Sequence, residues 1–387
     1  MNNWTGITEE KAHENLKEAI SINISSYYPD LSNTVLTRIN HELAVINSKK
    51  LSAEFLFFSD LVQTINSLNI RMSLGCGSAP SSIICYLLGI TNVDPIYHEL
   101  WFERFCNPLR DSNPDMVLEV ETGRRNDIFY EIIDMYGKDQ ATLLYRDQGN
   151  GYQEPYIALN GVLDEAISIQ LVECDSLKHS SIDNNHTLSL SNCIMILSKK
   201  NTEIFKNSIL NLDIYFSATR NLFTIDSFKD LVILIALKAN DNIDMLKAIS
   251  QKRTLNKIKD ETLHYLTARE WRPVRHLPNW YIDTMISVVG ETQNFIIYQE
   301  QIIKIFHDIY GLSGGEADLA RRVLISKHGN AFNTLELKCR AHVKAKQLSM
   351  DEHESLFYTM QNSASQTYLK SHFIGKALTS MVITSNK

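Results

Sequence analysis

The chain has 387 residues and 44% hydrophobic content, which is enough for a sizeable core and for two or three domains. Its formal net charge of −7 argues against a protein that wraps duplex nucleic acid, because neutralising phosphates requires a positive field. No apolar run has the length of a transmembrane helix, the N-terminus lacks the pattern of a signal peptide, and the cysteines show no C-x-x-C spacing. We therefore expect a reduced cytoplasmic protein with no membrane contact and no zinc site.

The N-terminal part is predicted to be helical. Apolar residues recur there at three- and four-residue steps, which predicts amphipathic helices over residues 7–20, 34–48 and 53–69. A glycine-rich stretch, GCGSAPSS at 75–82, then leads into the apolar helix SSIICYLLGI. A strand is predicted over 116–121, and a helix follows over 125–136.

The remainder divides into a mixed region and a helical region. Short β-like runs such as ATLLY, YIALNGVL and AISIQLVE lie between 140 and 225, with a loop over 176–192. No proline occurs after Pro278, which favours an all-helical C-terminal part. Lys and Arg outnumber Asp and Glu in 301–387, which indicates either a polyanion contact or a solvated helical surface.

Three stretches between Met72 and Asp139 have a specific resemblance. They read MSLGCGSAPSSIICYLLGIT, ELWFERFCNPLRDSNPDMVLEVE and DMYGKD. They resemble the palm of the bacterial C-family DNA polymerases, the DNA polymerase III alpha subunits, which read G-R-G-S-G-A-G-S, F-E-R-F-L-N-P-E-R and P-D-F-D-V-D-F. The resemblance implies a nucleotidyltransferase-like palm.

The glycine-rich stretch suits a phosphate, because glycines and a serine before a helix leave backbone N–H groups at a positive dipole end. Without G-K-[ST] it is not a Walker loop, and taken by itself it is more often a structural turn than a phosphate site. The resemblance implies that Gly75, Gly77 and Ser78 cradle a triphosphate, although Cys76 and Pro80 replace a family arginine and glycine.

The resemblance also places Arg104 and Arg110 near the triphosphate, where the planar guanidinium suits phosphate oxygens. The alternative is a structural ion pair with Glu103 or Asp111.

The predicted strand carries the acidic residues. Alternate strand residues face one side, which groups Asp115, Val117, Glu119 and Glu121. Two-metal transfer needs carboxylates that hold two Mg²⁺ ions about 3.5–4 Å apart. The first Asp of the family's D-V-D is Val117 here and the second is Glu119, so Glu119 and Glu121 would form a shifted pair. Alternatively, these carboxylates balance nearby arginines.

A third metal ligand has two competing alignments. In one, Asp213 of NLDIYF matches the Asp of the family's K-F-D-F-L-G-L strand. In the other, YFSATRNL matches a later segment and the catalytic strand is absent.

The C-terminal part resembles the fingers of the same family. The similar segments are DSFKDLVILIALKANDN, FIIYQEQIIKI, GLSGGEADLARRVLISK and SQTYLKSHF. The third implies that Arg321, Arg322 and Lys327 lie on a helix facing nucleotide and template, the alternative being an exposed basic face. In the fourth, Lys370 is the surviving basic candidate.

We therefore predict an α/β (α+β) fold, with the nucleotidyltransferase-like palm of the C-family polymerases and a helical thumb or fingers part. The expected divisions are an N-terminal helical segment at 1–50, a palm at 51–225 with a reduced thumb-like insertion at about 140–190, and fingers at 226–387. The resemblance begins near residue 34, and we find no family PHP domain or sliding-clamp-binding region in it.

Two main functions follow from the resemblance, beside a weaker third alternative in which an unrelated chemistry uses the old nucleotide cleft. The favoured one is Mg²⁺-dependent, or Mn²⁺-dependent, transfer from a nucleoside triphosphate to an oligonucleotide, a small molecule or a protein. Glu119, Glu121 and Asp213 would be catalytic, and these three with Asp115 would hold the metal. The other is an inactive pseudo-polymerase that binds nucleotide, nucleic acid or a protein partner, as Val117 and the acidic charge indicate.

Overall fold

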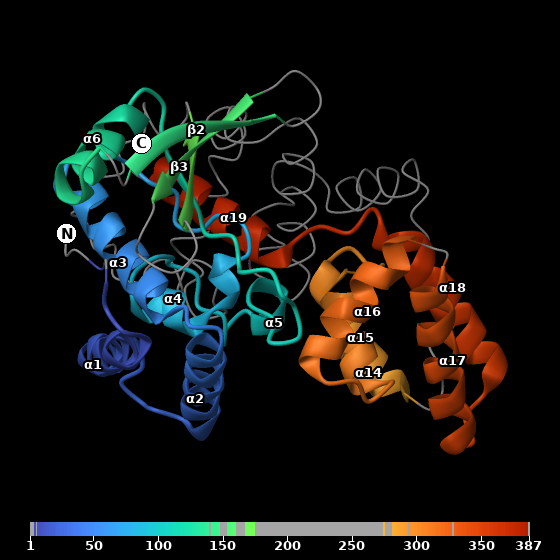
Figure 1. Ribbon diagram of the computed structural model, residues 1–387. Coiled ribbons are helices and arrows are strands. Elements are labelled where there is room, and N and C mark those ends of the chain that lie inside the picture. The colour runs from blue at the N-terminus through green and yellow to red at the C-terminus, as the bar shows by residue number, and fades with distance from the viewer. Residues whose placement is uncertain are drawn as a thin grey trace. The chain divides into compact units, whose positions relative to one another are not determined.

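The computed structural model describes residues 4, 6–138, 141–147, 153–159, 167–174, 274, 281–292, 295–326 and 329–385. The chain divides into two compact units (Figure 1). The first contains residues 1–201, 211–224 and 371–387, and the second contains 202–210 and 225–370. The palm and fingers divisions expected from the sequence stay a prediction.

Three helices begin the first unit: α1 (Glu9–Tyr27), α2 (Asn33–Ser48) and α3 (Ser52–Ser67). Side-chain oxygens of Thr8 and Ser32 cap the first two, as expected for residues that satisfy the free N–H groups of a first turn. Helix α3 is apolar around most of its surface and buried along most of its length, which is the pattern of a core helix. The first unit is therefore built around α3.

A four-stranded mixed sheet follows, in the order β1-β4-β3-β2. Strand β1 (Val117–Glu121) runs parallel to β4 (Ile167–Cys174), and β3 (Gln153–Leu159) is antiparallel to both β4 and β2 (Ala141–Asp147). Helix α6 (Arg125–Tyr136) links β1 to β2 in the chain. The strand predicted at 116–121 and the helix predicted at 125–136 are both present.

The other edge of β1 is covered by residues 71–73. The Ser73 N–H donates to the Glu119 carbonyl and the Glu121 N–H donates to the Arg71 carbonyl, each at 2.9 Å. The chain then passes through the glycine-rich stretch and the short helices η1 (Ala79–Ser81), α4 (Ile83–Leu87) and α5 (Phe102–Phe105). This pairing fixes where the glycine-rich stretch begins.

The described part of the second unit is helical, as the sequence predicted. Its helices are α14 (Ile282–Val289), η3 (Gly290–Thr292), α15 (Gln299–Asp308), α16 (Gly314–Ser326), α17 (Asn330–Ala345) and α18 (Met350–Ala364). The buried amide of Gln301 ties α14 to α15, since it accepts from the Ile297 and Tyr298 N–H groups and donates to Val288 and Thr292. Helices α15 to α18 pack on one another (Figure 1).

The last helix, α19 (Lys370–Ser385), starts at the final residue of the second unit, and from Ser371 onward it belongs to the first. The fold is thus α+β in the first unit and helical in the described part of the second. None of the helices in the described ranges is long and apolar enough to cross a membrane.

Candidate functional site

The glycine-rich loop lies directly beside β1. Residues 71–73 pair with the strand, so the next residues of the chain pass Val117 and Glu119. Gly77 adopts a φ of 63°, a conformation that side-chain-bearing residues rarely adopt, and a Cβ there would lie 3.7 Å from the Val117 Cβ. Gly75 is buried against Thr91 and Pro80. The structure therefore brings together the loop and the strand that the sequence singled out.

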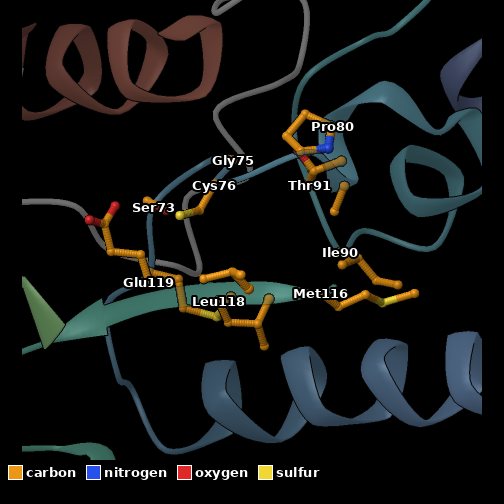
Figure 2. Close-up of a pocket in the computed structure, with 12 residues that line it drawn as sticks. Ser73, Gly75, Cys76, Pro80, Ile90, Thr91, Met116, Leu118 and Glu119 are labelled. Carbon is orange, nitrogen blue, oxygen red and sulfur yellow. The ribbon is translucent and has the colours of Figure 1, made fainter. Parts of the chain in front are cut away.

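A small cavity separates the loop from the strand (Figure 2). Its volume of about 10 Å³ gives room for about one water-sized species. The Glu119 side chain lies on the side of β1 that faces Cys76 of the loop, whereas the Leu118 side chain points to the other side (Figure 2). The lining residues are Met72, Ser73, Gly75, Cys76, Ala79, Pro80, Ile90, Thr91, Met116, Val117, Leu118 and Glu119.

Helix α19 holds the start of the loop. The Gly77 N–H donates to His372 Nδ1 at 3.1 Å, and the Ser371 hydroxyl donates to the Gly77 carbonyl at 3.0 Å. Three residues before Gly77, the Leu74 N–H donates to Thr379 Oγ1 at 2.9 Å. The loop is thus fixed by backbone hydrogen bonds to residues about 300 positions away in sequence.

The N-terminus of α4 is already capped by a carboxylate. Glu42 is fully buried and accepts from the Ile83 and Ile84 N–H groups and from the Ser82 hydroxyl. Arg38 neutralises it at 2.6 Å. The expectation of free N–H groups at this helix end was therefore wrong, because the anion there is supplied by the protein itself.

The acidic residues of β1 have different surroundings. Glu121 is buried and forms ion pairs with Arg71 at 3.0 Å and Arg124 at 3.4 Å. This matches the alternative in which a strand carboxylate balances nearby arginines. Glu119 is buried and lines the cavity, while Asp115 is exposed before the strand.

The described residues do not fit a two-metal centre. Val117 has no ligand atom, and the ion pairs of Glu121 with two arginines occupy its carboxylate. Across the described ranges, no three His, Cys, Asp or Glu side chains are grouped so that they could hold a metal ion. Asp213 lies outside the described residues.

A second buried acid interacts with Asp115. Glu54 on α3 is 7% exposed, and burial with the neighbouring Asp115 carboxylate raises its pKa to about 8. No sequence pattern singled out Glu54, because it stands as an ordinary polar residue in an amphipathic helix.

The arginines of the first unit lie near the loop in sequence but differ in their contacts. The Arg110 guanidinium donates to the Phe105 carbonyl at 2.9 Å, and Arg104 is half-buried on α5. Glu103, the ion-pair partner considered for Arg104, contacts His41 at 3.0 Å. Ser78 is half-buried and accepts from the Ser81 N–H through its carbonyl.

The arginines of α16 are engaged within the second unit. Arg321 is 3% exposed and bonds Asp318, which is fully buried, at 3.1 Å. Arg322 is partly exposed and its guanidinium lies 3.5 Å from the same carboxylate. Lys327 lies outside the described residues. The Lys370 side chain is buried near the Tyr298 ring. The backbone N–H of Lys370 donates to the Glu300 carboxylate.

Sequence reasoning missed the residues that hold the site: Arg38, Glu42, Arg71, Ser371 and His372. Only one signal pointed to any of them. The SQTYLKSHF match contains Ser371 and His372, but its chemistry was assigned to Lys370. The others act through contacts that depend on the folded chain.

Two segments of the chain match known protein families. Residues 8–146 match the family described as the bacterial DNA polymerase III alpha NTPase domain, and residues 217–347 match the bacterial DNA polymerase III alpha subunit finger domain. The glycine-rich loop and β1 fall in the first match, and α16 falls in the second.

Curated relatives carry the corresponding names. The DNA polymerase III subunit alpha of Thermotoga maritima is 26% identical over 388 residues, which covers 90% of this chain and 44% of the relative. That of Saccharopolyspora erythraea is 43% identical over 115 residues, 30% of this chain and 10% of the relative. An error-prone DNA polymerase of Corynebacterium glutamicum is 36% identical over 143 residues, 35% of this chain and 14% of the relative. The chain thus spans less than half the length of these relatives, and it belongs to the family of bacterial C-family DNA polymerase III alpha subunits.

Proposed function

We propose that this chain binds a nucleoside triphosphate through its polymerase-like palm without transferring a nucleotidyl group by a two-metal centre. The observation that carries the proposal is the environment of β1. In the described part of the chain, Glu119 is the strand carboxylate that lines the cavity beside Gly77. Glu121 on the same face is neutralised by two arginines, and Val117, which lies beside Gly77, is apolar.

Nucleotide binding is supported by the family and by the retained loop. Gly77 keeps the left-handed conformation that a close backbone approach requires, and the loop lies against the strand of the palm. Arg104 and Arg110 belong to the same unit and are the cationic candidates for the phosphates. We expect the protein to act in the cytoplasm, with a nucleic-acid end or a protein as the second ligand.

Nucleotidyl transfer is the competing function, and one observation favours it. Glu119 retains a position beside the loop. Its carboxylate could hold a metal there if Asp213 supplied a second carboxylate ligand. The two functions differ in what the metal does: it is required for transfer but dispensable for simple binding.

Titration calorimetry with dATP separates these functions. The proposal predicts binding in EDTA as well as in Mg²⁺, and Glu119→Gln should leave the affinity within about twofold. Glu131→Gln, on the exposed face of α6, is the matched control. Binding that requires Mg²⁺ and is lost in Glu119→Gln, but not in the control, would contradict the proposal.

Val117→Asp provides a gain-of-function arm. It places a second carboxylate two residues from Glu119 on the same strand face, next to the loop. We expect Mg²⁺ to strengthen dATP binding in this variant and not in Val117→Asn, which has nearly the same shape but no charge.

A further inference from the structure

Helix α19 contacts the glycine-rich loop along one face. Ser371, His372, Gly375 and Thr379 recur at helical spacing, and each touches the loop between Leu74 and Gly77. A Cβ added to Gly375 would lie 2.2 Å from the Gly75 carbonyl oxygen, so the two backbones are in close contact. We call these four residues the α19 clamp.

The clamp uses both polar groups of the Gly77 backbone. The N–H donates to His372 Nδ1 at 3.1 Å and the carbonyl accepts from Ser371 at 3.0 Å. Because Nδ1 accepts this hydrogen bond, the neutral imidazole of His372 carries its proton on Nε2. A backbone N–H has one hydrogen to donate, so it cannot fully serve both His372 and a phosphate oxygen.

We propose that His372 is an internal competitor for phosphate at the glycine-rich loop, and this inference rests on the proposed nucleotide binding. In the clamped state the imidazole nitrogen occupies the direction in which Gly77 would bind a phosphate oxygen. Binding a triphosphate at Gly77 therefore requires the first turn of α19 to release the loop.

The clamp has a second consequence for selectivity. The Thr379 hydroxyl accepts from the Leu74 N–H and also donates to the Gly375 carbonyl, so the loop stays attached to the third turn of α19 when His372 is released. Ligands that compensate for the lost Gly77 hydrogen bond are selected over those that do not. A polyanion with several phosphate oxygens can do so, whereas a nucleoside without phosphate cannot.

The test is titration calorimetry of the full chain with inorganic triphosphate as the probe. His372→Ala removes the competitor and should bind about three- to tenfold more tightly than the wild type, the equivalent of one net hydrogen bond. His372→Asn should bind like the wild type, because Asn Oδ1 stands the same number of bonds from Cβ as Nδ1 and also accepts. His307→Ala, in the second unit, is the matched control and should change nothing.

Ser371→Ala is a milder variant for the case in which His372→Ala does not fold. It removes only the hydroxyl that holds the Gly77 carbonyl and should tighten binding by about twofold to threefold. Amide exchange at Gly77 should accelerate in both variants, which reports on the clamp without any ligand.

The outcomes distinguish the inference from the proposed function. Equal affinity of the wild type and His372→Ala would overturn the competition while leaving triphosphate binding in place. Weaker binding by His372→Ala would also overturn it, since His372 would then support the binding loop. If no variant binds triphosphate, the proposed function fails and the inference fails with it.

Discussion

Both units contain ion pairs between neighbours on one helix, and the first unit adds polar contacts that reach much farther along the chain. In the first unit, Glu42 contacts Ser82, Arg71 contacts Glu121 and Gly77 contacts His372, across 40, 50 and 295 residues. In the described part of the second unit, many ion pairs join residues three or four apart on one helix, as in Asp318–Arg321, Lys304–Asp308 and Glu336–Arg340.

This difference matters for the nucleotide site. Pairs at i,i+3 and i,i+4 form as soon as their helix forms, so they require no other segment. The contacts around the loop and β1 exist only when α2, α4, β1 and α19 are all in place. The loop of the first unit is therefore a product of tertiary structure, and changes at distant residues should alter it.

Glu42→Ala should have the largest effect, because it removes a buried same-helix ion pair together with long-range hydrogen bonds to residues 82–84. It leaves Arg38 without its buried partner and removes the acceptor for the α4 N-terminus, so we expect about 4 kcal/mol of destabilisation. Urea unfolding measures this. Glu131→Ala, exposed on α6, should cost less than about 0.5 kcal/mol. Similar values for the two variants would mean that the Glu42 contacts carry little energy.

Asp318→Ala tests the short-range side. It leaves Arg321 buried without its carboxylate, and we expect a loss of about 3 kcal/mol. Glu336→Ala removes a partly exposed pair with Arg340 at the same kind of spacing, and about 0.5 kcal/mol is expected. If both variants lose the same stability, burial does not distinguish the two pairs.

The raised pKa of Glu54 predicts how the stability of the first unit depends on pH. Its pKa is raised from 4.5 to about 8, so between these values the folded state holds a proton that the unfolded chain has lost. Stability contributed by this group therefore falls as the pH rises from about 4.5 to 8. Glu54→Gln should remove that slope and stabilise the protein at pH 7, by about 3 kcal/mol at most. Unfolding at pH 5, 6, 7 and 8 checks this, and an unchanged slope in Glu54→Gln would contradict it.

Gly375→Ala tests the close contact between the α19 clamp and the glycine-rich loop. The added Cβ would collide with the Gly75 carbonyl, and we expect about 2 kcal/mol of destabilisation despite the better helix propensity of alanine. Gly290→Ala is the matched control, because its Cβ would meet an ordinary contact at 3.7 Å and its φ is −61°. A stabilised Gly375→Ala would show that α19 does not press on the loop.

The sequence predicted the local structure better than the site. Periodicity placed α2, α3 and α6 within about two residues of their bounds, because their apolar faces repeat regularly. The first helix runs to Tyr27 instead of residue 20, since the Ser- and Ile-rich end breaks the apolar period without stopping the helix. The β-like run at 141–145 falls within β2, and the one at 166–173 nearly coincides with β4.

Only the parts of the site that carry a family motif could be predicted from the sequence. The resemblance identified the loop and β1, and their contact follows from the pairing of residues 71–73 with the strand. Nothing local showed that Glu42 caps α4, that Arg71 neutralises Glu121 or that His372 binds Gly77. These contacts join segments far apart in the chain, and single-sequence patterns carry no record of such pairs.

Pyrophosphate release tests the central claim most directly. The full chain is incubated with the four deoxynucleoside triphosphates, a primed template and either Mg²⁺ or Mn²⁺, and pyrophosphate is measured with time. Our account predicts none above the protein-free rate, because in the described residues β1 brings one carboxylate to the cavity where two-metal transfer needs a pair. Metal-dependent release that disappears in Glu119→Gln would contradict it and would identify an active polymerase-like centre.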